Sequence, residues 1–357
     1  MSPQASSRLA LLRFPLIVGV VFIHAYGTSL NFADGSTVGL AGEHAGADFV
    51  RNLVVQGIAR IAVPLFFLMS GYLFFYGGSW STPRYLDKLR SRAVTLLLPF
   101  LFWNLLILVL TAAAQQLPGL QSLFSSDKLP IAQYSLFDAV DAVFGITRTP
   151  IAYQFWFIRD LMLLIVLSPV LHAAITRLSW AVLVPLYLAW QFSVWPLPMP
   201  SVEGTLFFSI GAWLACQRRD LFAVDRHGRL IVLAFVPVML LDAALTGSAA
   251  GALLHKLDVL LGVASTLVLS GYALRSPALV DRLIALSAAS FFVFAVHEPL
   301  LTVLRKLAYR LLQPQSSALV LLLFFAIPLL TVLIALLLHA LARAVAPRFT
   351  ALISGGR

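Results

Sequence analysis

The first apolar stretch of the sequence carries an arginine and a histidine on one predicted helix face. Arg13 and His24 are eleven residues apart; three helical turns take about 10.8 residues, so the two side chains lie about 16 Å apart along one face. An imidazole can act as a general base near neutral pH, and a guanidinium can bind an anion. The pair predicts an anion site that leads to a deeper base. The alternative is a snorkelling arginine and an unrelated packing histidine.

A second histidine is predicted at a comparable depth. Ser290 and His297 follow Ser287 at offsets of three and ten, which places the three side chains on one helix face. Glu298 follows directly. Two histidines at similar depth on separate helices predict that His24 and His297 share a site, and the alternative is two separate packing histidines.

Other polar residues lie in or beside apolar runs. Arg60 is in the middle of such a run and needs a partner or a polar ligand there. Ser70 with the glycine after it indicates a close helix contact. Trp156 and Arg159 open another apolar run, where an interfacial aromatic residue and an ion pair with Asp160 are the ordinary interpretation.

A basic stretch precedes the third long apolar run. Lys88, Arg90 and Arg92 lie there, and together with Arg13 they would suit a phosphate-rich ligand. The alternative for any one of them is the ordinary excess of basic residues on the cytoplasmic side of a membrane protein.

The composition shows what kind of element must position these residues. Of the 357 residues, 60% are hydrophobic and 11% charged, against roughly 45–50% and about 25% in a soluble domain. A soluble protein of this size cannot bury so much apolar surface, which excludes a soluble enzyme, a disordered protein and a fibre. Long apolar runs favour helices over the short alternating strands of an outer-membrane barrel. The sequence predicts an all-α polytopic membrane protein with a single domain over residues 1–357.

Ten runs are predicted as transmembrane helices. Crossing about 30 Å of hydrocarbon needs roughly 17–25 mostly apolar residues. Two of the ten are short and are joined by a proline-rich turn, and the last contains a proline that predicts a kink or tilt. The ten predicted spans cover residues 9–29, 53–76, 93–115, 157–176, 180–195, 202–216, 230–247, 254–273, 283–305 and 317–345.

The net charge of +10 is explained by the loops that hold the basic residues. With a cytoplasmic N-terminus, roughly two-thirds of the lysines and arginines fall on the cytoplasmic side, which predicts that both termini are cytoplasmic. Arg305, Lys306 and Arg310 fit this topology poorly and are either an exception or a site for an external anion. We expect a multi-pass protein of the inner or plasma membrane, with two long outer loops at 30–52 and 116–156 and no nucleic-acid partner.

The sequence lacks the common metal and nucleotide motifs. Its one cysteine, Cys216, lies in an apolar run, and no His-Glu-x-x-His, Walker or Rossmann glycine pattern occurs. We therefore expect no metal site and no permanently bound cofactor.

The ordered set of motifs resembles the acyltransferase 3 family of membrane-bound acyltransferases over nearly the whole chain. One departure concerns the basic stretch, where the family often has two arginines three residues apart and this sequence has other spacings. The similar motifs are Arg13 with His24, Arg60 to Tyr72, the basic stretch followed by Pro99 and Trp103, Phe155-Trp156-Phe157, Phe208 to Ala215, and Ser290 to His297.

The resemblance implies a ten-helix enzyme that moves an acyl group, usually acetyl, from cytoplasmic acyl-CoA to a hydroxyl, often of a sugar. It implies that His24 is catalytic, with Arg13 as its paired arginine. Acetyl-CoA is then a co-substrate, and the acceptor is an exopolysaccharide, an O-antigen or a lipid-linked oligosaccharide. We expect acyl-CoA to be bound by Arg13, Lys88, Arg90 and Arg92, and the acceptor side to be supported by Arg60, Ser70, Trp156, Arg159, Ser290, His297 and Glu298.

Two other classes of function stay open at this point. Intramembrane arginine and histidine residues also suit a membrane transporter or exporter, and a glycan polymerase is another polytopic class with long outer loops. For an acyltransferase, His24 either takes the proton of the acceptor hydroxyl or is itself acylated first.

Overall fold

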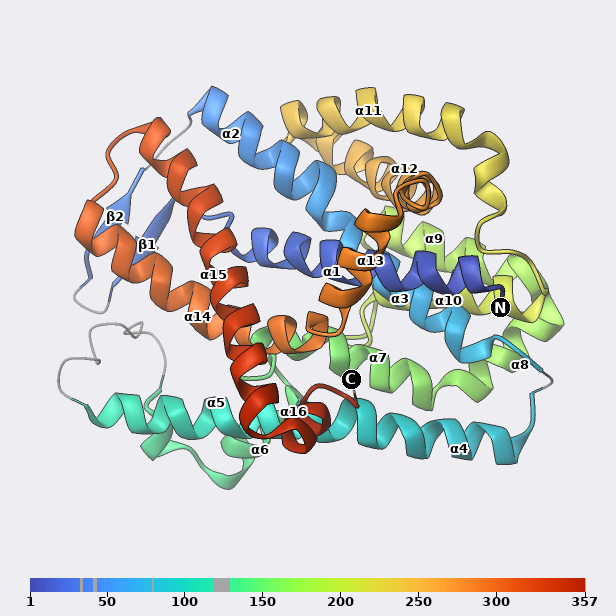
Figure 1. Cartoon of the computed structure of the whole chain (residues 1–357), viewed down its shortest axis with the longest axis horizontal. Coiled ribbons are helices and arrows are strands. Elements are labelled where there is room, and N and C mark those ends of the chain that lie inside the picture. Colours follow the sequence, from blue (N-terminus) through green and yellow to red (C-terminus); the bar gives the residue numbers. More distant parts are fainter. Residues whose placement is uncertain (33–34, 41–43, 79, 118–128, 357) are drawn as a thin grey trace. The chain divides into compact units, whose positions relative to one another are not determined.

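The structure is a computed structural model that describes residues 1–32, 35–40, 44–78, 80–117 and 129–356. Nearly all of its regular elements are helices, and they form two compact units (Figure 1). Helix α1 (Pro3–His24) contributes to both. The first unit comprises Met1–Val20, Asn52–Ala93 and Phe157–Ser290, and the second comprises Val21–Arg51, Val94–Trp156 and Phe291–Arg357.

The first unit is built mainly from the middle of the chain. A π-helical turn (Leu53–Ile58) and a 3-10 turn (Ala59–Ile61) lead into its first long buried helix. Its helices are α3 (Ala62–Phe75), α4 (Thr82–Arg92), α7 (Trp156–Val166), α8 (Ser168–Leu178), α9 (Leu183–Gln191), α10 (Val202–Cys216), α11 (Gly228–Leu245), α12 (Ala249–Ala273) and α13 (Pro277–Ser287).

Two glycines let α3 and α10 pack backbone against backbone. A Cβ atom at Gly71 would lie 2.1 Å from the carbonyl oxygen of Phe208, and one at Gly211 would lie 2.1 Å from that of Leu68. Only glycine fits at these two positions unless a backbone moves. Small residues at a helix crossing are how membrane helices approach closely, so this is the contact that Ser70 and the following glycine predict.

The second unit joins the end of α1 to the last helices of the chain. It includes an antiparallel hairpin of β1 (Ser29–Asn31) and β2 (Thr37–Gly39), in which Ser29 is opposite Gly39. Its helices are α2 (Ala45–Asn52), α5 (Leu98–Gln116), α6 (Leu136–Phe144), α14 (Ser290–Leu312), α15 (Ser317–Val345) and α16 (Pro347–Ile353).

Aromatic side chains fill the core of the second unit. Trp103 of α5 packs edge-on against Phe292 of α14 with ring centroids 5.7 Å apart. Its indole Nε1 donates to the carbonyl oxygen of Ile353 at 3.0 Å. Phe22 near the end of α1 contacts Phe324 of α15 at 5.6 Å. This packing fixes the end of α1, which carries His24, and the first turn of α14, the helix that carries His297.

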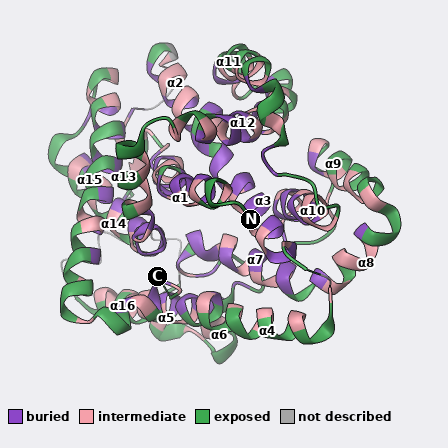
Figure 2. Cartoon of the chain, turned by 45° about the vertical axis from the view of Figure 1, so that its right-hand side comes forward, coloured by how far each residue is buried: buried purple, intermediate pink, exposed green. Residues whose placement is uncertain are grey.

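The long helices expose apolar side chains, as expected for surfaces that face lipid. Figure 2 shows α11 and α15 exposed along much of their length, and the exposed residues include Leu233 of α11 and Leu337 of α15. Among the described residues, seven helices are long and apolar enough to cross a membrane, and a bent pair would add an eighth. The protein is therefore a multi-pass membrane protein.

The observed helices differ from the ten predicted spans at three places. The span predicted at 157–176 is divided into α7 and α8, because Pro169 in the first turn of α8 has no N–H to donate back into α7. Helices α8 and α9 together make one candidate span, Ser168–Gln191. Helix α10, in contrast, has the bounds of the span predicted at 202–216, and its 15 residues give about 22 Å of rise. The span predicted at 283–305 is a pair of helices, α13 and α14, bent by 63°.

Candidate active site

His24 is the last residue of α1 and lies in the second unit. Two residues earlier on the same helix, Phe22 contacts both Phe324 and Phe325 of α15, with ring centroids 5.6 and 6.0 Å apart. The apolar sequence of α1 favours a continuous helix, and the proline within it, Pro15, is exposed. The helix end that carries His24 is therefore fixed by packing.

A chain of hydrogen bonds joins His24 to a buried carboxylate. Nδ1 of His24 lies 2.9 Å from the hydroxyl of Tyr153, and this hydroxyl donates to Oε1 of Glu298. The other carboxylate oxygen, Oε2, accepts a hydrogen bond from the hydroxyl of Thr302 at 2.8 Å. All four residues belong to the second unit, so the chain Glu298–Tyr153–His24 is formed within one compact body.

The chain determines which nitrogen of His24 carries the proton. A carboxylate can only accept, so the single hydroxyl proton of Tyr153 points to Glu298. The tyrosine oxygen then accepts from Nδ1–H of His24, and the lone pair of the imidazole is on Nε2. Withdrawal of the hydroxyl from water and the Glu298 carboxylate raise the pKa of Tyr153. The phenol thus keeps its proton near neutral pH, and the imidazole of His24 is held with its lone pair on Nε2.

Two arginines hold the backbone at the end of α1. Arg305 of α14 donates to the carbonyl oxygens of His24 at 3.2 Å and Gly27 at 2.8 Å. Arg51 of α2 donates from Nε and Nη2 to the carbonyl oxygen of Tyr26. The last carbonyls of a helix have no partner within it, so these guanidiniums cap the helix end that carries His24. Arg305, one of the residues that fit the predicted topology poorly, has a local role here.

His297 lies beside His24, as expected for a shared site. The two ring centroids are 5.3 Å apart. His297 is 0% exposed, and its Nδ1 lies 2.7 Å from the carbonyl oxygen of Phe294. A carbonyl only accepts, so Nδ1 carries the proton and Nε2 the lone pair. This Nε2 is buried and has no hydrogen-bond partner among the described residues.

The first unit contains a cavity of about 600 Å³ lined by aromatic and basic side chains. Trp80 stacks on His172, with ring centroids 4.6 Å apart and planes 14° apart, and it also stacks on Phe75. Basic side chains outnumber the single carboxylate, which suits an anionic ligand with a flat ring. The charged residues that line this cavity are Arg84, Lys88, Arg218, Arg219 and Asp220.

The structure distributes the four predicted acyl-CoA-binding residues within the first unit. Lys88 lines the cavity and donates to the carbonyl oxygen of Phe74. Arg13 and Arg92 are close enough for their charges to repel each other, an arrangement that a bound anion would relieve. The side chain of Arg90 is 81% exposed and lies 3.7 Å from its neighbour Asp87 in a surface ion pair.

Arg60 and Arg159 have partners inside the first unit. Arg60 donates from Nε to Gln56 at 3.3 Å and is attracted by the charge of Glu203. Arg159 forms a 3.0 Å ion pair with Asp160. The other oxygen of this buried carboxylate accepts from the backbone N–H of Ser201 at 2.7 Å. The Arg159–Asp160 pair therefore joins α7 to the N-terminus of α10.

The remaining predicted site residues are described by their places on the helices. Ser70 is half-buried on α3, and Trp156 is the first residue of α7. The expectation that Ser287 shares a helix face with Ser290 and His297 is wrong, because α13 ends at Ser287 and the next helix begins at Ser290 after the 63° bend. Ser290 is buried, and its hydroxyl has no hydrogen-bond partner among the described residues.

Sequence reasoning missed Tyr153, and it interpreted Arg305 as an exception to the topology or as part of a site for an external anion. Both had a signal. Tyr153 stands two residues before the Phe155-Trp156-Phe157 motif, where a polar aromatic residue begins an apolar run. Arg305 follows Glu298 by seven residues, which is two helical turns and therefore the same face of α14.

Comparisons with known proteins show the family. A family model described as an acyltransferase domain matches residues 7–340, from α1 into α15. The succinoglycan biosynthesis protein ExoH of Rhizobium meliloti (strain 1021) is 28% identical over 366 aligned residues, which cover 100% of this chain and 94% of that protein. No solved structure matches. The chain belongs to the acyltransferase 3 family, and the protein is a multi-pass membrane O-acyltransferase.

Proposed function

We propose that this enzyme transfers an acyl group, acetyl in the first instance, from cytoplasmic acyl-CoA to a hydroxyl of a polysaccharide or lipid-linked sugar, with His24 as the general base. The observation that carries this proposal is the hydrogen-bonded chain Glu298–Tyr153–His24. A base whose second nitrogen is held by an orienting partner is the arrangement that activates a weak oxygen nucleophile.

The proposed reaction moves one proton and exchanges one bond. The acceptor oxygen attacks the thioester carbonyl as Nε2 of His24 takes the hydroxyl proton. The C–O bond forms, the C–S bond breaks, and the CoA thiolate leaves. The thiolate then takes the proton back from His24, which returns to its starting form. Tyr153 and Glu298 stabilise the imidazolium while it exists, because Glu298 supplies a negative charge behind the hydroxyl.

His24 is a better candidate for the base than His297. Both rings have their lone pair on Nε2, but His24 is half-buried and His297 is 0% exposed. A base must come within about 2.6–3.2 Å of the proton that it removes, and an enclosed nitrogen is poorly placed for a large sugar. We assign His297 a supporting role beside His24.

For the donor, we propose the basic aromatic cavity of the first unit. Its stacked Trp80 and His172 offer flat surfaces for an adenine ring, and Arg84 and Lys88 offer cations for phosphates. Arg13 and Arg92 form a second cationic pair in the same unit. The cavity supports an acyl-CoA donor because CoA joins a purine, several phosphates and an uncharged arm in one molecule.

For the acceptor, the similar protein ExoH indicates a carbohydrate, since its name places it in succinoglycan biosynthesis. We propose that the acceptor here is a sugar hydroxyl of an exopolysaccharide, an O-antigen or a lipid-linked oligosaccharide. We propose that an enzyme joining a cytoplasmic donor to such an acceptor lies in the cell's inner or plasma membrane, and the excess of basic residues supports cytoplasmic termini.

The experiment that tests this function supplies isotopically labelled acetyl-CoA, and succinyl-CoA in parallel, to membranes that contain the protein. We expect label to appear in glycan and His24→Ala to lower the rate by about 10²–10⁴-fold. The matched control is His227→Ala, because His227 is exposed at the end of a 3-10 helix (Ala223–His227) and contacts Arg226. Undiminished transfer by His24→Ala would contradict the role of His24 as the base. Absence of transfer from either thioester by the native protein would contradict acyl-CoA as the donor.

A further inference from the structure

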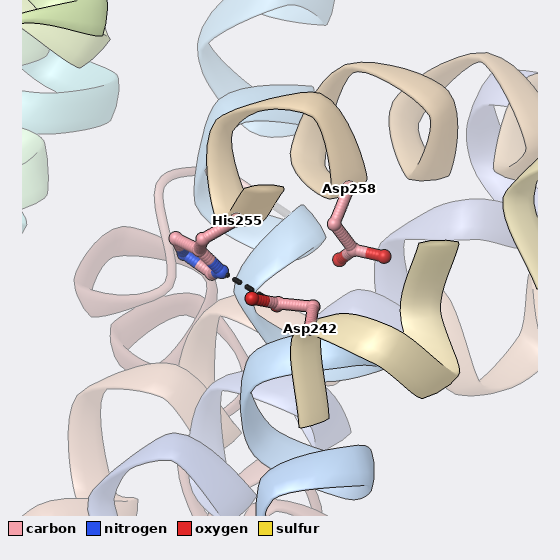
Figure 3. A group of neighbouring side chains, drawn as sticks. All are labelled: Asp242, His255 and Asp258. Atoms are coloured by element: carbon pink, nitrogen blue, oxygen red, sulfur yellow. Dashed lines mark hydrogen bonds and ion pairs between the residues drawn. The ribbon is translucent and has the colours of Figure 1, made fainter. Parts of the chain in front are cut away.

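We propose that Asp242, His255 and Asp258 form a binding site for a divalent metal ion between α11 and α12. Each residue offers one ligand atom, and these atoms all lie within 4.8 Å of one another. His255 and Asp258 are three residues apart on α12, so they share a face, and Asp242 reaches this face from α11. Figure 3 shows the three side chains converging from the two helices. The site belongs to the first unit and plays no part in the proposed acyl transfer.

The burial of Asp258 and the lack of a partner for its carboxylate indicate a bound ligand. Its side chain is 0% exposed, and neither carboxylate oxygen has a hydrogen-bond partner among the described residues. Asp242 beside it is also buried. The Oδ2 atom of Asp242 lies 2.8 Å from Nδ1 of His255, so Asp258 is the member of the pair that has no partner among the described residues. A buried carboxylate without a donor next to a second carboxylate is strongly unfavourable, and buried charges in proteins are normally paired or coordinate a metal. Both oxygens of Asp258 are thus available to a cation at this place.

The lysine that neighbours this cluster in the sequence is engaged elsewhere. Lys256 follows His255 in the sequence, but it is attracted by Glu203 and its Nζ lies 4.6 Å from the centroid of the Trp190 ring. His255 contributes through Nδ1, which lies 2.8 Å from Oδ2 of Asp242. An imidazole carries at most one positive charge against two carboxylates, so the ionised cluster retains negative charge that a dication would neutralise.

The donor atoms indicate which ions fit. Carboxylate oxygens suit Mn²⁺ and the harder ions, whereas imidazole suits Zn²⁺ and the later transition metals. Nδ1 and Oδ2 at 2.8 Å can occupy neighbouring positions around one ion with metal–ligand distances of about 2.0–2.2 Å. The mixed set favours Zn²⁺ or Mn²⁺ over Ca²⁺, because three protein ligands are few for the six to eight oxygens of calcium.

An entry path leads to the cluster. The side chain of His255 is 26% exposed and lines a cavity of about 500 Å³ together with Gln191, Phe192 and Leu253. Water from this cavity could complete the coordination shell, and an ion could enter beside His255. Helices α11 and α12 are otherwise joined by the three-residue turn 246–248, so a bound ion would pin the two helices next to that turn.

The test measures metal content and stability of the whole purified protein in detergent. After treatment with a chelator and dialysis against Zn²⁺ or Mn²⁺, elemental analysis should find about one ion per chain. Adding the ion should raise the melting temperature by about 2–5 °C. Asp258→Asn should abolish both effects without lowering the melting temperature of the metal-free protein, because it also removes a buried charge.

The matched control is Ser265→Ala, which alters a buried side chain of α12 two turns beyond Asp258. This variant should bind the ion as the native protein does. Less than about 0.1 ion per chain, or a melting temperature that neither ion changes, would overturn the site and indicate that the two aspartates share a proton. Equal binding by Asp258→Asn would overturn it as well, since the ion would then be held elsewhere.

Discussion

The residue that contacts Nδ1 of His24 is a tyrosine, Tyr153. The carboxylate of Glu298 contacts the hydroxyl of this tyrosine and not the imidazole. A phenol with a raised pKa remains neutral, so it can orient the imidazole without placing a charge next to the substrate. The buried Glu298 supplies the charge from behind the hydroxyl. The orientation of His24 and the stabilisation of its protonated form are thus assigned to different side chains.

We predict that Tyr153→Phe lowers the rate of acyl transfer by roughly 10–100-fold, less than loss of the base itself. The variant keeps the ring but removes the link between His24 and Glu298. The imidazolium becomes harder to form, so the rise of the rate with pH should move to lower pH. A pH–rate profile measures this shift, which a merely structural defect would not produce. Tyr187→Phe on α9 is the control, and a profile identical to the native one in Tyr153→Phe would contradict the relay.

At the scale of helices, function depends on where they end and how closely they approach. Helix α1 ends at the candidate base and is capped there by Arg305. Helices α3 and α10 cross at two glycines whose neighbours are backbone atoms. In each case a specific local contact positions the helix, namely the cap at the end of α1 and the glycine crossing of α3 and α10. The apolar composition of these helices alone would not define these positions.

We predict that Gly71→Ala destabilises the protein by about 1–3 kcal/mol. The added methyl group would lie 2.1 Å from the carbonyl oxygen of Phe208, and a backbone cannot move aside as a flexible side chain can. Thermal unfolding in detergent measures the loss. Gly46→Ala is the control, because a methyl group added there on α2 would have nothing within 4 Å; an equal effect of the two variants would argue against close packing of α3 and α10.

The sequence predicts much of the site but not its connections. His24, His297 and Glu298, which lie together in the second unit, can be picked out in the sequence because ionisable residues are costly in apolar helices. Tyr153 is missed because a tyrosine at the start of an apolar run is common, and its partners are more than a hundred residues away. The bend between α13 and α14 is missed for a similar reason, since no proline or glycine lies between Ser287 and Ser290 to signal it.

The proposed metal site of Asp242, His255 and Asp258 is likewise not predictable from the sequence. Asp242 and Asp258 look ordinary in the sequence, where they are far from any metal motif, and only the pairing of α11 with α12 brings their ligand atoms within 4.8 Å. Spacing along one helix can be read from the sequence, whereas the identity of the neighbouring helix depends on tertiary packing.

At the scale of the whole molecule, the orientation in the membrane is open to a direct test. The chain has one cysteine, so Cys216→Ser provides a background without thiols. In that background we expect Thr149→Cys to react with a membrane-impermeant maleimide from outside the cell. Asp281→Cys, on α13, should react only in inside-out vesicles, because the excess of basic residues predicts that this part of the chain is on the cytoplasmic side.

Both introduced cysteines would replace exposed residues, so accessibility reports sidedness rather than burial. The parent Cys216→Ser protein is the control and should not be labelled from either side. Labelling of Asp281→Cys in intact cells would contradict the predicted topology and, with it, cytoplasmic termini.

Each compact unit takes its residues from three separated segments of the chain, and this interleaving has a consequence during biosynthesis. His24 emerges early, while Tyr153 follows 129 residues later and Glu298 a further 145 after that. At about 5–20 residues per second, the ribosome needs roughly 14–55 s between the histidine and the glutamate. Throughout that interval a nascent chain holds the proposed base without the groups that orient it, so we expect the enzyme to become active only when translation is nearly finished.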